Sequence, residues 1–260
     1  MSDLLDGKVV LVTGGASGLG KAIVIACLGA KATVVISDIN EKSLEECEKE
    51  LGNVESPDKL SKVVTDVSNE DSAAKAIQHA IDKFSRLDVL INCAGIMDAF
   101  DPVDGLDLQL WNRVIAVNLT GPVLMSKYAV KHFLGREKPS GAIMNIGSIA
   151  ALRGALAAGA AYTASKHGLV GITRNTAAAY AKQGIRCNIV LPGTMETNIA
   201  HSMPACPNES LVKVTQSMLA VHPNFVQVDH VAKTVVHLAS DSAEAINGAI
   251  ITADGGFTAF

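Results

Sequence analysis

Aromatic and charged residues are both scarce in this chain of 260 residues. Phe, Trp and Tyr make up 4% of the sequence, and Asp, Glu, Lys and Arg make up 18%, with a net charge of −4. The sequence has no basic stripe, so nucleic acid is not an expected partner, because contact with phosphates needs clustered Lys and Arg. Hydrophobic residues reach 48%, which excludes disorder of the whole chain.

Cysteine is also sparse, and the spacing of the cysteines matches no disulfide or metal-binding motif. The five cysteines form no CxxC pair, and no Cys or His cluster has the spacing of metal ligands, so no metal site is expected. Scattered thiols in a chain with a full core suggest a reducing, cytoplasmic location. The chain begins without a basic region followed by an apolar run, so we predict no secretory signal. No uncharged apolar run reaches about 18 residues, so we predict no membrane partner.

Short β-branched runs alternate with longer segments of helical periodicity. Strands are expected at residues 8–13, 32–37, 62–65, 87–92, 141–146, 185–191 and 249–252. Helices are expected at residues 17–28, 41–51, 70–84, 108–133 with an interruption near Gly121-Pro122, 160–182 and 228–239. This α/β alternation predicts a single doubly wound, Rossmann-like domain over residues 1–260, with about seven parallel strands and helices on both faces. Residues 194–212, here called the flap, are expected to be an irregular substrate-binding segment.

The first expected strand runs directly into a glycine-rich segment, TGGASGLG, at residues 13–20. Glycine at such a strand-to-helix turn permits positive φ and lets the backbone approach a pyrophosphate. The helix that follows offers free N–H groups to the phosphates. A tight turn without a ligand is the alternative. The predicted cofactor contacts here are Gly14, Ser17, Gly18, Leu19 and Gly20.

Acidic residues end the next two strands. Asp38 can accept both hydroxyls of a ribose and repels a 2′-phosphate, and no cation neighbours it, so NAD(H) is favoured over NADP(H). Capping of the next helix, which Asn40 or Ser43 could also perform, is the alternative for Asp38. Asp66 followed by Val67 could contact the adenine, or Asp66 could equally be a helix N-cap. The small residues that close the fourth strand, Asn92, Ala94 and Gly95, suit close passage of the cofactor.

A tyrosine and a lysine lie one helical turn apart in the segment 160–182. Because positions i and i+4 share a helix face, the Lys166 ammonium is expected to lower the pKa of Tyr162 toward the range of general acid–base catalysis. Such a pair alone is commonplace on helix surfaces. Ser148 follows the fifth strand and could hold a substrate oxygen. Asn118 lies in a long helix, where it could anchor a proton-relay water or could satisfy a kinked backbone.

These motifs, taken in order, resemble the short-chain dehydrogenase/reductase (SDR) family over essentially the whole chain. The matching elements are the glycine loop, Asp66, the block 92–95, Asn118, Ser148, Tyr162, Lys166, Pro192-Gly193 and the block 254–256. The resemblance implies that Tyr162 is the general acid/base, that Lys166 lowers its pKa and binds the nicotinamide ribose, that Ser148 orients the substrate oxygen and that Asn118 holds the relay water. It further implies that Pro192, Gly193, Thr194 and Thr197 flank the nicotinamide, and that the protein is a homo-oligomer, a tetramer or a dimer.

The chain departs from the family pattern at two places. One more residue than is common separates Ser148 from Tyr162, so we expect a local bulge within residues 150–161. Cys93 replaces an asparagine that is common in the family, and its side chain is expected to point into the packing with little functional effect. A redox role for Cys93 is disfavoured, because nothing nearby lowers a thiol pKa.

The sequence therefore predicts an NAD(H)-dependent oxidoreductase that interconverts a secondary alcohol and a ketone. An apolar pocket is expected from Ile149, Leu152, Leu156, Met195 and the flap, so a hydrophobic or cyclic substrate is favoured. The alternative of the same class is an NADP(H)-dependent ketoreductase of the 3-oxoacyl thioester or polyketide type. The alternative of another class is a dinucleotide-binding regulator without turnover, because a fold does not fix a function.

Overall fold

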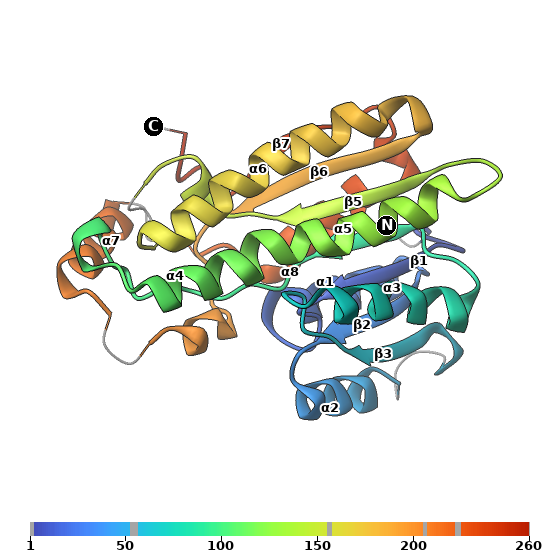
Figure 1. Cartoon of the computed structure of the whole chain (residues 1–260), viewed down its shortest axis with the longest axis horizontal. Helices are drawn as coiled ribbons and strands as arrows, with labels where there is room; N and C mark the ends of the chain where they lie inside the picture. The colour runs from blue at the N-terminus through green and yellow to red at the C-terminus, as the bar shows by residue number, and fades with distance from the viewer. Residues whose placement is uncertain (1–2, 53–56, 155–157, 205–206, 222–224, 260) are drawn as a thin grey trace.

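The computed structural model describes residues 3–52, 57–154, 158–204, 207–221 and 225–259, and a seven-stranded parallel sheet forms its centre (Figure 1). The strand order is β3-β2-β1-β4-β5-β6-β7. The strands are β1 (Val9–Thr13), β2 (Thr33–Asp38), β3 (Leu60–Val64), β4 (Val89–Asn92), β5 (Gly141–Ile146), β6 (Ile185–Pro192) and β7 (Ile250–Ala253). This arrangement confirms the predicted doubly wound, Rossmann-like fold.

Helices cover both faces of the sheet. They are α1 (Gly18–Gly29), α2 (Glu41–Gly52), α3 (Glu70–Phe84), α4 (Leu108–Ile115), α5 (Gly121–Leu134), α6 (Ala160–Tyr180), α7 (Glu209–Val221) and α8 (Val228–Ala239). Helix α1 packs against α8, and α3 packs against α5. The interruption predicted near Gly121-Pro122 is a π-helical turn at Ala116–Thr120, after which the chain continues as α5. Pro122 is tolerated there because it lies in the first turn of α5.

The two faces of β1 are both buried, which explains why its sequence is one continuous apolar run. Val10 and Val12 belong to the hydrophobic cluster that includes α1 and α8, whereas Val9 and Leu11 belong to the cluster that includes α3 and α5. Successive residues of a strand point to opposite faces, so a sheet that is covered on both sides needs apolar residues at every position. The predicted strand pattern follows from this burial.

Helix α7 is absent from the predicted elements, and this is the main error in the expected fold. The sequence placed the irregular flap over residues 194–212, but α7 begins at Glu209 and a 3-10 turn occupies Asn198–Ser202. The side chain of Asn208 accepts a hydrogen bond from the Leu211 amide at 3.1 Å. An asparagine at this position before an apolar segment is an N-cap signal, and it is the feature that could have revealed the helix. The other predicted boundaries agree within two residues.

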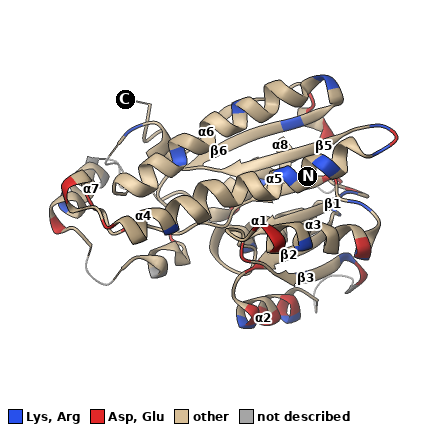
Figure 2. Ribbon diagram, in the orientation of Figure 1, with Lys and Arg blue, Asp and Glu red and all other residues tan. Residues whose placement is uncertain are grey.

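Two glutamates of α2 form ion pairs with neighbouring elements. Lys62 lies 2.8 Å from Glu48, and Lys21 lies 2.6 Å from Glu50. Figure 2 shows charges of both signs along this helix. Among the described helices, none combines the length and the apolar character that a membrane crossing requires.

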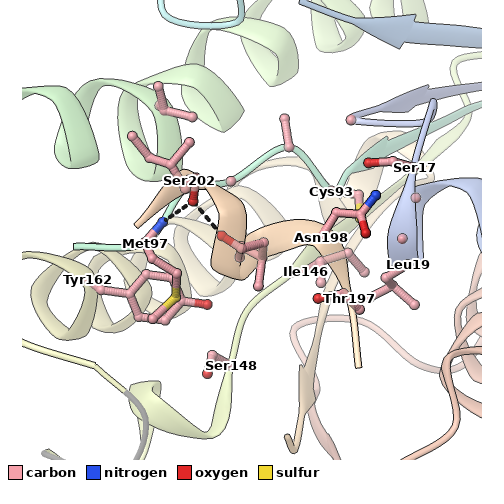
Figure 3. A pocket seen from close by; sticks show the side chains of 18 of the residues that line it. Ser17, Leu19, Cys93, Met97, Ile146, Ser148, Tyr162, Thr197, Asn198 and Ser202 are labelled. Carbon is pink, nitrogen blue, oxygen red and sulfur yellow. Dashed lines mark hydrogen bonds between the residues drawn. The ribbon is translucent and has the colours of Figure 1, made fainter. Parts of the chain in front are cut away.

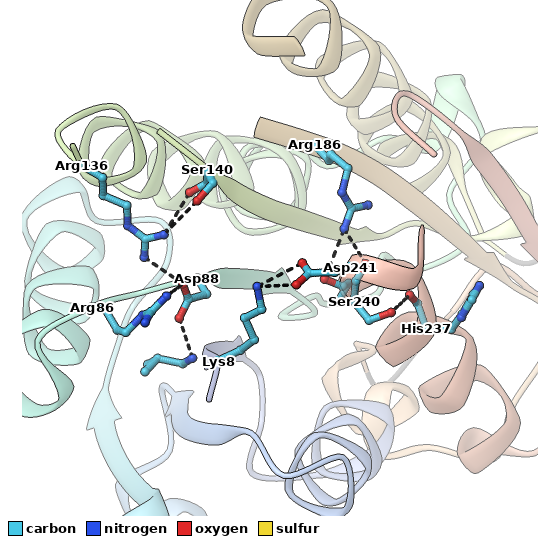
Figure 4. A network of polar contacts seen from close by, with 11 residues as sticks. Lys8, Arg86, Asp88, Arg136, Ser140, Arg186, His237, Ser240 and Asp241 are labelled. Carbon is cyan, nitrogen blue, oxygen red and sulfur yellow. Dashed lines mark hydrogen bonds and ion pairs between the residues drawn. The ribbon is translucent and has the colours of Figure 1, made fainter. Parts of the chain in front are cut away.

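A network of hydrogen bonds and ion pairs connects several elements at the amino-terminal end of the sheet, on the side away from the glycine loop (Figure 4). The buried Asp88 carboxylate accepts hydrogen bonds from the Val9 amide at 2.9 Å, from Arg86 at 2.6 Å and from Arg136 at 3.1 Å. It therefore joins β1, the start of β4 and the segment after α5. The neighbouring Lys8–Asp241 pair is much more open, because the Asp241 side chain is 79% exposed.

Substitution of Asp88 is expected to destabilise the protein strongly. Asp88→Ala leaves the Val9 amide and two guanidinium groups without their common acceptor, and we expect a loss of about 2–4 kcal/mol in the free energy of unfolding. Asp241→Ala is the matched control, because an exposed ion pair contributes about 1 kcal/mol or less. Urea unfolding measures both variants. Equal losses in the two variants would contradict the structural role of Asp88.

Candidate active site

A cavity of about 680 Å³ opens at the carboxyl ends of the strands, where the strand order reverses between β1 and β4. Open α/β sheets bind ligands at this switch point. The predicted site residues that line the cavity are Gly14, Ser17, Gly18, Leu19, Gly20, Asp38, Asp66, Val67, Ala94, Gly95, Ser148, Tyr162, Lys166, Pro192, Gly193, Thr194 and Thr197. Figure 3 shows several of them around the opening. Asn92 and Asn118 are the two predicted site residues outside this wall.

The glycine loop is folded so tightly that side chains cannot replace its glycines. Gly14 and Gly18 have φ of 64° and 51°. A Cβ on Gly14 would lie 2.8 Å from the Ala94 Cα, and a Cβ on Gly20 would overlap the Gly14 carbonyl oxygen. The loop leads into the first turn of α1, whose N–H groups are the anion-binding end of a helix. This cradle fits the pyrophosphate of a dinucleotide.

Asp38 lies between the glycine loop and the cavity. Its carboxylate accepts hydrogen bonds from the Ala16 amide at 3.2 Å and from the Asn40 amide at 3.1 Å. The cap of α2 comes from Asn40, whose side chain accepts from the Ser43 amide at 3.1 Å. The cap alternative for Asp38 is therefore wrong. The loop holds this carboxylate at the wall of the cavity, and its contact with a ribose stays a prediction.

Asp66 also is not a helix cap. Its Oδ1 accepts from the Ser68 amide at 2.9 Å and from the Ser68 hydroxyl at 2.6 Å. The N-cap of α3 is Asn69, which accepts from the Ser72 amide at 2.9 Å. Asp66 and Val67 line the cavity, and their contact with an adenine stays a prediction.

Asn92 supports the site from inside the sheet and does not contact the cavity. It is 2% exposed, and its Nδ2 donates to Asn145 Oδ1 at 2.9 Å and to Ser126 Oγ at 3.3 Å. Asn92 and Asn145 are paired in the β4–β5 register, so the amide cross-links adjacent strands. The Asn92 side chain is thus used within the sheet, and its predicted cofactor contact stays a prediction. The following residue, Cys93, is held by its amide, which donates to Thr13 Oγ1 at 3.0 Å.

Ser148, Tyr162 and Lys166 meet on one wall of the cavity. Tyr162 and Lys166 come from α6, and Ser148 comes from the turn after β5 and lines the same cavity. The Lys166 ammonium lies 5.4 Å from the centroid of the Tyr162 ring and donates to the Ile146 carbonyl at 3.0 Å. Helix α6 and the turn after β5 thus bring together a phenol, an alcohol and an ammonium.

The expected fall in the Tyr162 pKa is not seen in the protein by itself. Burial raises the pKa of Tyr162 to about 12, and the side chain of Ser148 lowers it by less. Burial also lowers the pKa of Lys166 to about 8, because desolvation penalises an ammonium. At neutral pH the site therefore holds a protonated phenol and a largely cationic lysine.

Asn118 is fully buried in the π-helical turn and fastens a neighbouring loop. Its Oδ1 accepts from the Ile96 amide at 2.8 Å, and its Nδ2 donates to the Ile96 carbonyl at 2.9 Å and to Ser165 Oγ at 3.3 Å. Its partners lie outside its own helix, so the alternative that it satisfies a kinked backbone is wrong. The relay water stays a prediction.

The two departures from the family pattern have different outcomes. Cys93 packs against the core, as expected, and it also lines the cavity. Burial raises the pKa of Cys93 to about 12, which disfavours a reactive thiolate. The extra residue lies in a segment of which the structure describes a 3-10 turn at Ile149–Ala151, while residues 155–157, and with them Leu156, lie outside the described residues.

The apolar wall of the cavity differs in part from the expected one. Ile149 and Met195 line it as predicted, but Leu152 is 42% exposed and lies outside the wall, because it follows the 3-10 turn. Ile199, in the flap, also lines the cavity, whereas the sequence missed Met97, an apolar lining residue that no motif marks. Among the described residues, no group of His, Cys, Asp and Glu is arranged to hold a metal ion.

Comparisons with known proteins match this chain over nearly its whole length. A family model described as "Enoyl-(Acyl carrier protein) reductase" matches residues 14–258. The chain is 45% identical to "Short chain dehydrogenase/reductase dpchG" of Colletotrichum higginsianum, over 98% of this chain and 95% of that protein. It is 38% identical to "3beta-hydroxysteroid dehydrogenase 2" of Eggerthella lenta, over 99% of this chain and 97% of that protein. The crystal structure of gox2181 is 32% identical and superposes with a TM-score of 0.88, over 98% of this chain and 97% of that one.

A dinucleotide cradle beside a phenol, an alcohol and an ammonium is the site of an oxidoreductase that acts on alcohol groups. The chain belongs to the short-chain dehydrogenase/reductase family, as the order of its motifs predicted. It is an enzyme that interconverts alcohols and ketones, and the family implies a nicotinamide dinucleotide, NAD or NADP, as its cofactor.

Proposed function

We propose that the enzyme interconverts a secondary alcohol and a ketone with NAD(H), on a hydrophobic or cyclic substrate, with Tyr162 as the general acid/base. The observation that carries this proposal is the meeting of Ser148, Tyr162 and Lys166 in the cavity that also contains the glycine loop and Asp38. When bound, the nicotinamide supplies or accepts the hydride. The roles of the protein residues follow from their positions and charges.

Tyr162 is the proton donor when a ketone is reduced. Because its pKa is raised to about 12, the phenol keeps its proton at neutral pH and can give it to a substrate oxygen. The Ser148 hydroxyl, which lines the same cavity, holds the same oxygen. The Lys166 ammonium stabilises the phenolate that remains, and the Ile146 carbonyl keeps it in place. In the oxidation direction the phenolate accepts the proton.

The lining of the substrate end supports an apolar or cyclic substrate. Met97, Ile149, Met195 and Ile199 supply hydrophobic side chains beside Tyr162. Two relatives have names of dehydrogenases for cyclic secondary alcohols, the hydroxysteroid enzyme above and "Cis-4-hydroxycyclohexanecarboxylate dehydrogenase" of Sinomonas cyclohexanicum, which is 36% identical over 100% of both chains. Burial of a ring against such side chains contributes about 25 cal/mol per Å² of apolar surface.

A substrate panel with both cofactors tests this function. We expect NADH formation with cyclic secondary alcohols and NADH consumption with the matching ketones. Preferred reduction of a 3-oxoacyl thioester with NADPH would favour the thioester alternative. Binding of NADH without turnover of any alcohol or ketone would favour a non-catalytic regulator.

The preference for NAD(H) is expected to depend on Asp38. Asp38→Ala removes the carboxylate that would repel a 2′-phosphate, so the ratio of kcat/KM for NADP(H) over NAD(H) should rise about ten-fold or more. Asp66→Ala is the matched control, because it removes an acid that lines the same cavity at the end of the adjacent strand. A ratio that is unchanged in Asp38→Ala would contradict the ribose contact.

The remaining proposals concern the chain as a whole. We propose one domain over residues 1–260, in which the flap covers the substrate end of the cavity. The support is that Met195, Thr197, Ile199 and Ser202, all in the flap, line the cavity. The homo-oligomer, tetramer or dimer, stays a prediction, which size-exclusion chromatography with light scattering measures.

A further inference from the structure

The loop of residues 96–101, here called the bridging loop, contacts the first turn of α6. The Asp98 carboxylate accepts hydrogen bonds from the Gly159 amide and from the Tyr162 amide, both at 2.9 Å. The Ala160 amide donates to the Asp101 carbonyl at 2.9 Å. The contact leaves no space at Gly159, where a Cβ would lie 2.5 Å from the Asp101 amide nitrogen. The helix that carries Tyr162 therefore begins against this loop.

The opposite side of the bridging loop contacts the flap. The Met97 amide donates to the Ser202 hydroxyl at 2.9 Å, as Figure 3 shows, and the Asn208 amide donates to the Ala99 carbonyl at 2.8 Å. At the beginning of the loop, the side chain of Asn118 holds both backbone groups of Ile96. One short segment thus connects the flap, the π-helical turn and the start of α6.

Asp98 is an unusual residue for a buried position. It is 2% exposed, and within the described parts of the chain no Lys or Arg forms a salt bridge with it. A buried carboxylate is unfavourable unless hydrogen bonds compensate it. Here the compensation comes from the amides of Phe100, Gly159 and Tyr162 and from the positive end of the α6 dipole. Helix α6 has no side-chain cap from its own N-cap residue, so Asp98 supplies one from 64 residues away.

We propose that Asp98 is a positioning residue: its carboxylate fixes the first turn of α6, and with it Tyr162, to the bridging loop that also holds the flap. The inference rests on the proposed role of Tyr162 as general acid/base. It predicts that a loss of order in the flap reaches Tyr162 through backbone hydrogen bonds.

Asp98 also acts on Tyr162 through its charge. The groups that shift the pKa of Tyr162, besides burial, are Ser148, which lowers it, and Asp98 and Cys93, which raise it. Lys166 is the cation that faces the ring from the same helix. Removal of the Asp98 charge should therefore lower the pKa of Tyr162. The rise of the alcohol-oxidation rate with pH, which follows ionisation of this phenol and is here called the alkaline limb, should then occur at lower pH.

The variant Asp98→Asn tests the position and the charge together. The Gly159 and Tyr162 amides donate to different oxygens of Asp98, and Asn replaces one of these oxygens by an NH2 donor. One of the two amides therefore loses its acceptor, and we expect kcat to fall about ten- to a hundred-fold with the Kd for NADH unchanged. The alkaline limb of kcat for alcohol oxidation should move to lower pH. A fall in kcat with an unmoved limb, or no change in either, would overturn the proposal.

Asp107→Ala is the matched control for the loss of a helix cap. Asp107 caps α4 by accepting from the Leu110 amide at 2.7 Å, and it makes no contact with Tyr162. This variant should be less stable than the wild type, but the alkaline limb of its kcat for alcohol oxidation should not shift. An equal shift of the limb in both variants would assign the effect of Asp98→Asn to a general loosening and would count against Asp98.

Hydrogen exchange in the wild-type enzyme provides a test that does not depend on the folding of a variant. The Gly159 and Tyr162 amides should exchange at least ten-fold more slowly than the amides in the first turn of α8, which has no side-chain cap. Ser202→Ala should accelerate exchange at Met97 and also at Gly159 and Tyr162. Equal exchange in the two first turns would overturn the cap, and unchanged exchange at α6 in Ser202→Ala would overturn the link to the flap.

Different results would contradict the acid/base role of Tyr162 and the positioning role of Asp98. If Tyr162→Phe keeps full turnover, the proposed function fails, yet slow exchange at the start of α6 would remain. If the α6 amides exchange rapidly while Tyr162→Phe is inactive, Asp98 is not the positioning residue and the acid/base role of Tyr162 stands.

Discussion

Tyr162→Phe is expected to lower turnover about 10²–10⁴-fold, because the variant removes the one group placed to exchange a proton with the substrate oxygen. The hydroxyl is a small part of a large cavity wall, so the Kd for NADH should change little. The wild-type rate of alcohol oxidation should rise with pH as Tyr162 ionises, since its pKa is raised and the phenolate is the base. The Phe variant should lose this rise. Steady-state kinetics over a pH series and fluorescence titration with NADH measure the two effects.

Tyr180→Phe is the matched control for this substitution. Tyr180 lies at the other end of α6 and packs, partly buried, against the cluster that contains α3 and α5. Loss of its hydroxyl should leave kcat and the pH profile unchanged. If Tyr162→Phe retained turnover within a few-fold of the wild type, the acid/base role would be wrong and Ser148 would become the next proton donor to test.

The fold could be predicted because its signals are local. The apolar runs of β1 and β2 reflect burial on both faces of the sheet, and this burial is visible in the sequence as an absence of alternation. Helix α7 was missed because its neighbours are irregular and its one clear signal, Asn208, lies among other polar residues. The π-helical turn was marked by Gly121-Pro122 and by Asn118, an amide that the sequence could place in a helix but not pair with Ile96.

The site was predictable where the backbone itself forms it. The glycine loop and Asp38 lie at fixed offsets from strand ends, so the sequence places them at the carboxyl edge of the sheet. Asp98 carries no such signal, because its partners at Gly159 and Tyr162 are distant in sequence and are backbone amides. The pKa of Tyr162 was predicted in the wrong direction because the spacing to Lys166 reveals charge, whereas burial of the phenol appears only in the folded chain.

Gly20→Ala is expected to abolish tight binding of the cofactor. The new Cβ would overlap the Gly14 carbonyl oxygen, and a backbone atom cannot move aside without opening the loop that cradles the pyrophosphate. We expect the Kd for NADH to rise about a hundred-fold or more, which corresponds to about 2.7 kcal/mol of binding free energy. Fluorescence titration gives the Kd, and far-UV circular dichroism verifies that α1 and the sheet are retained.

Gly29→Ala provides the control on the same helix. Gly29 ends α1, and a Cβ there meets no atom within 4 Å. Alanine is preferred over glycine in a helix by about 1 kcal/mol, so this variant should be as stable as the wild type or more stable, with an unchanged Kd for NADH. Both variants place an alanine on the same helix, so a change in the Kd for NADH in Gly20→Ala alone would come from the glycine loop and not from helix propensity. Wild-type affinity in Gly20→Ala would show that the pyrophosphate is bound elsewhere, because no relaxed loop could hold both that Cβ and the cradle.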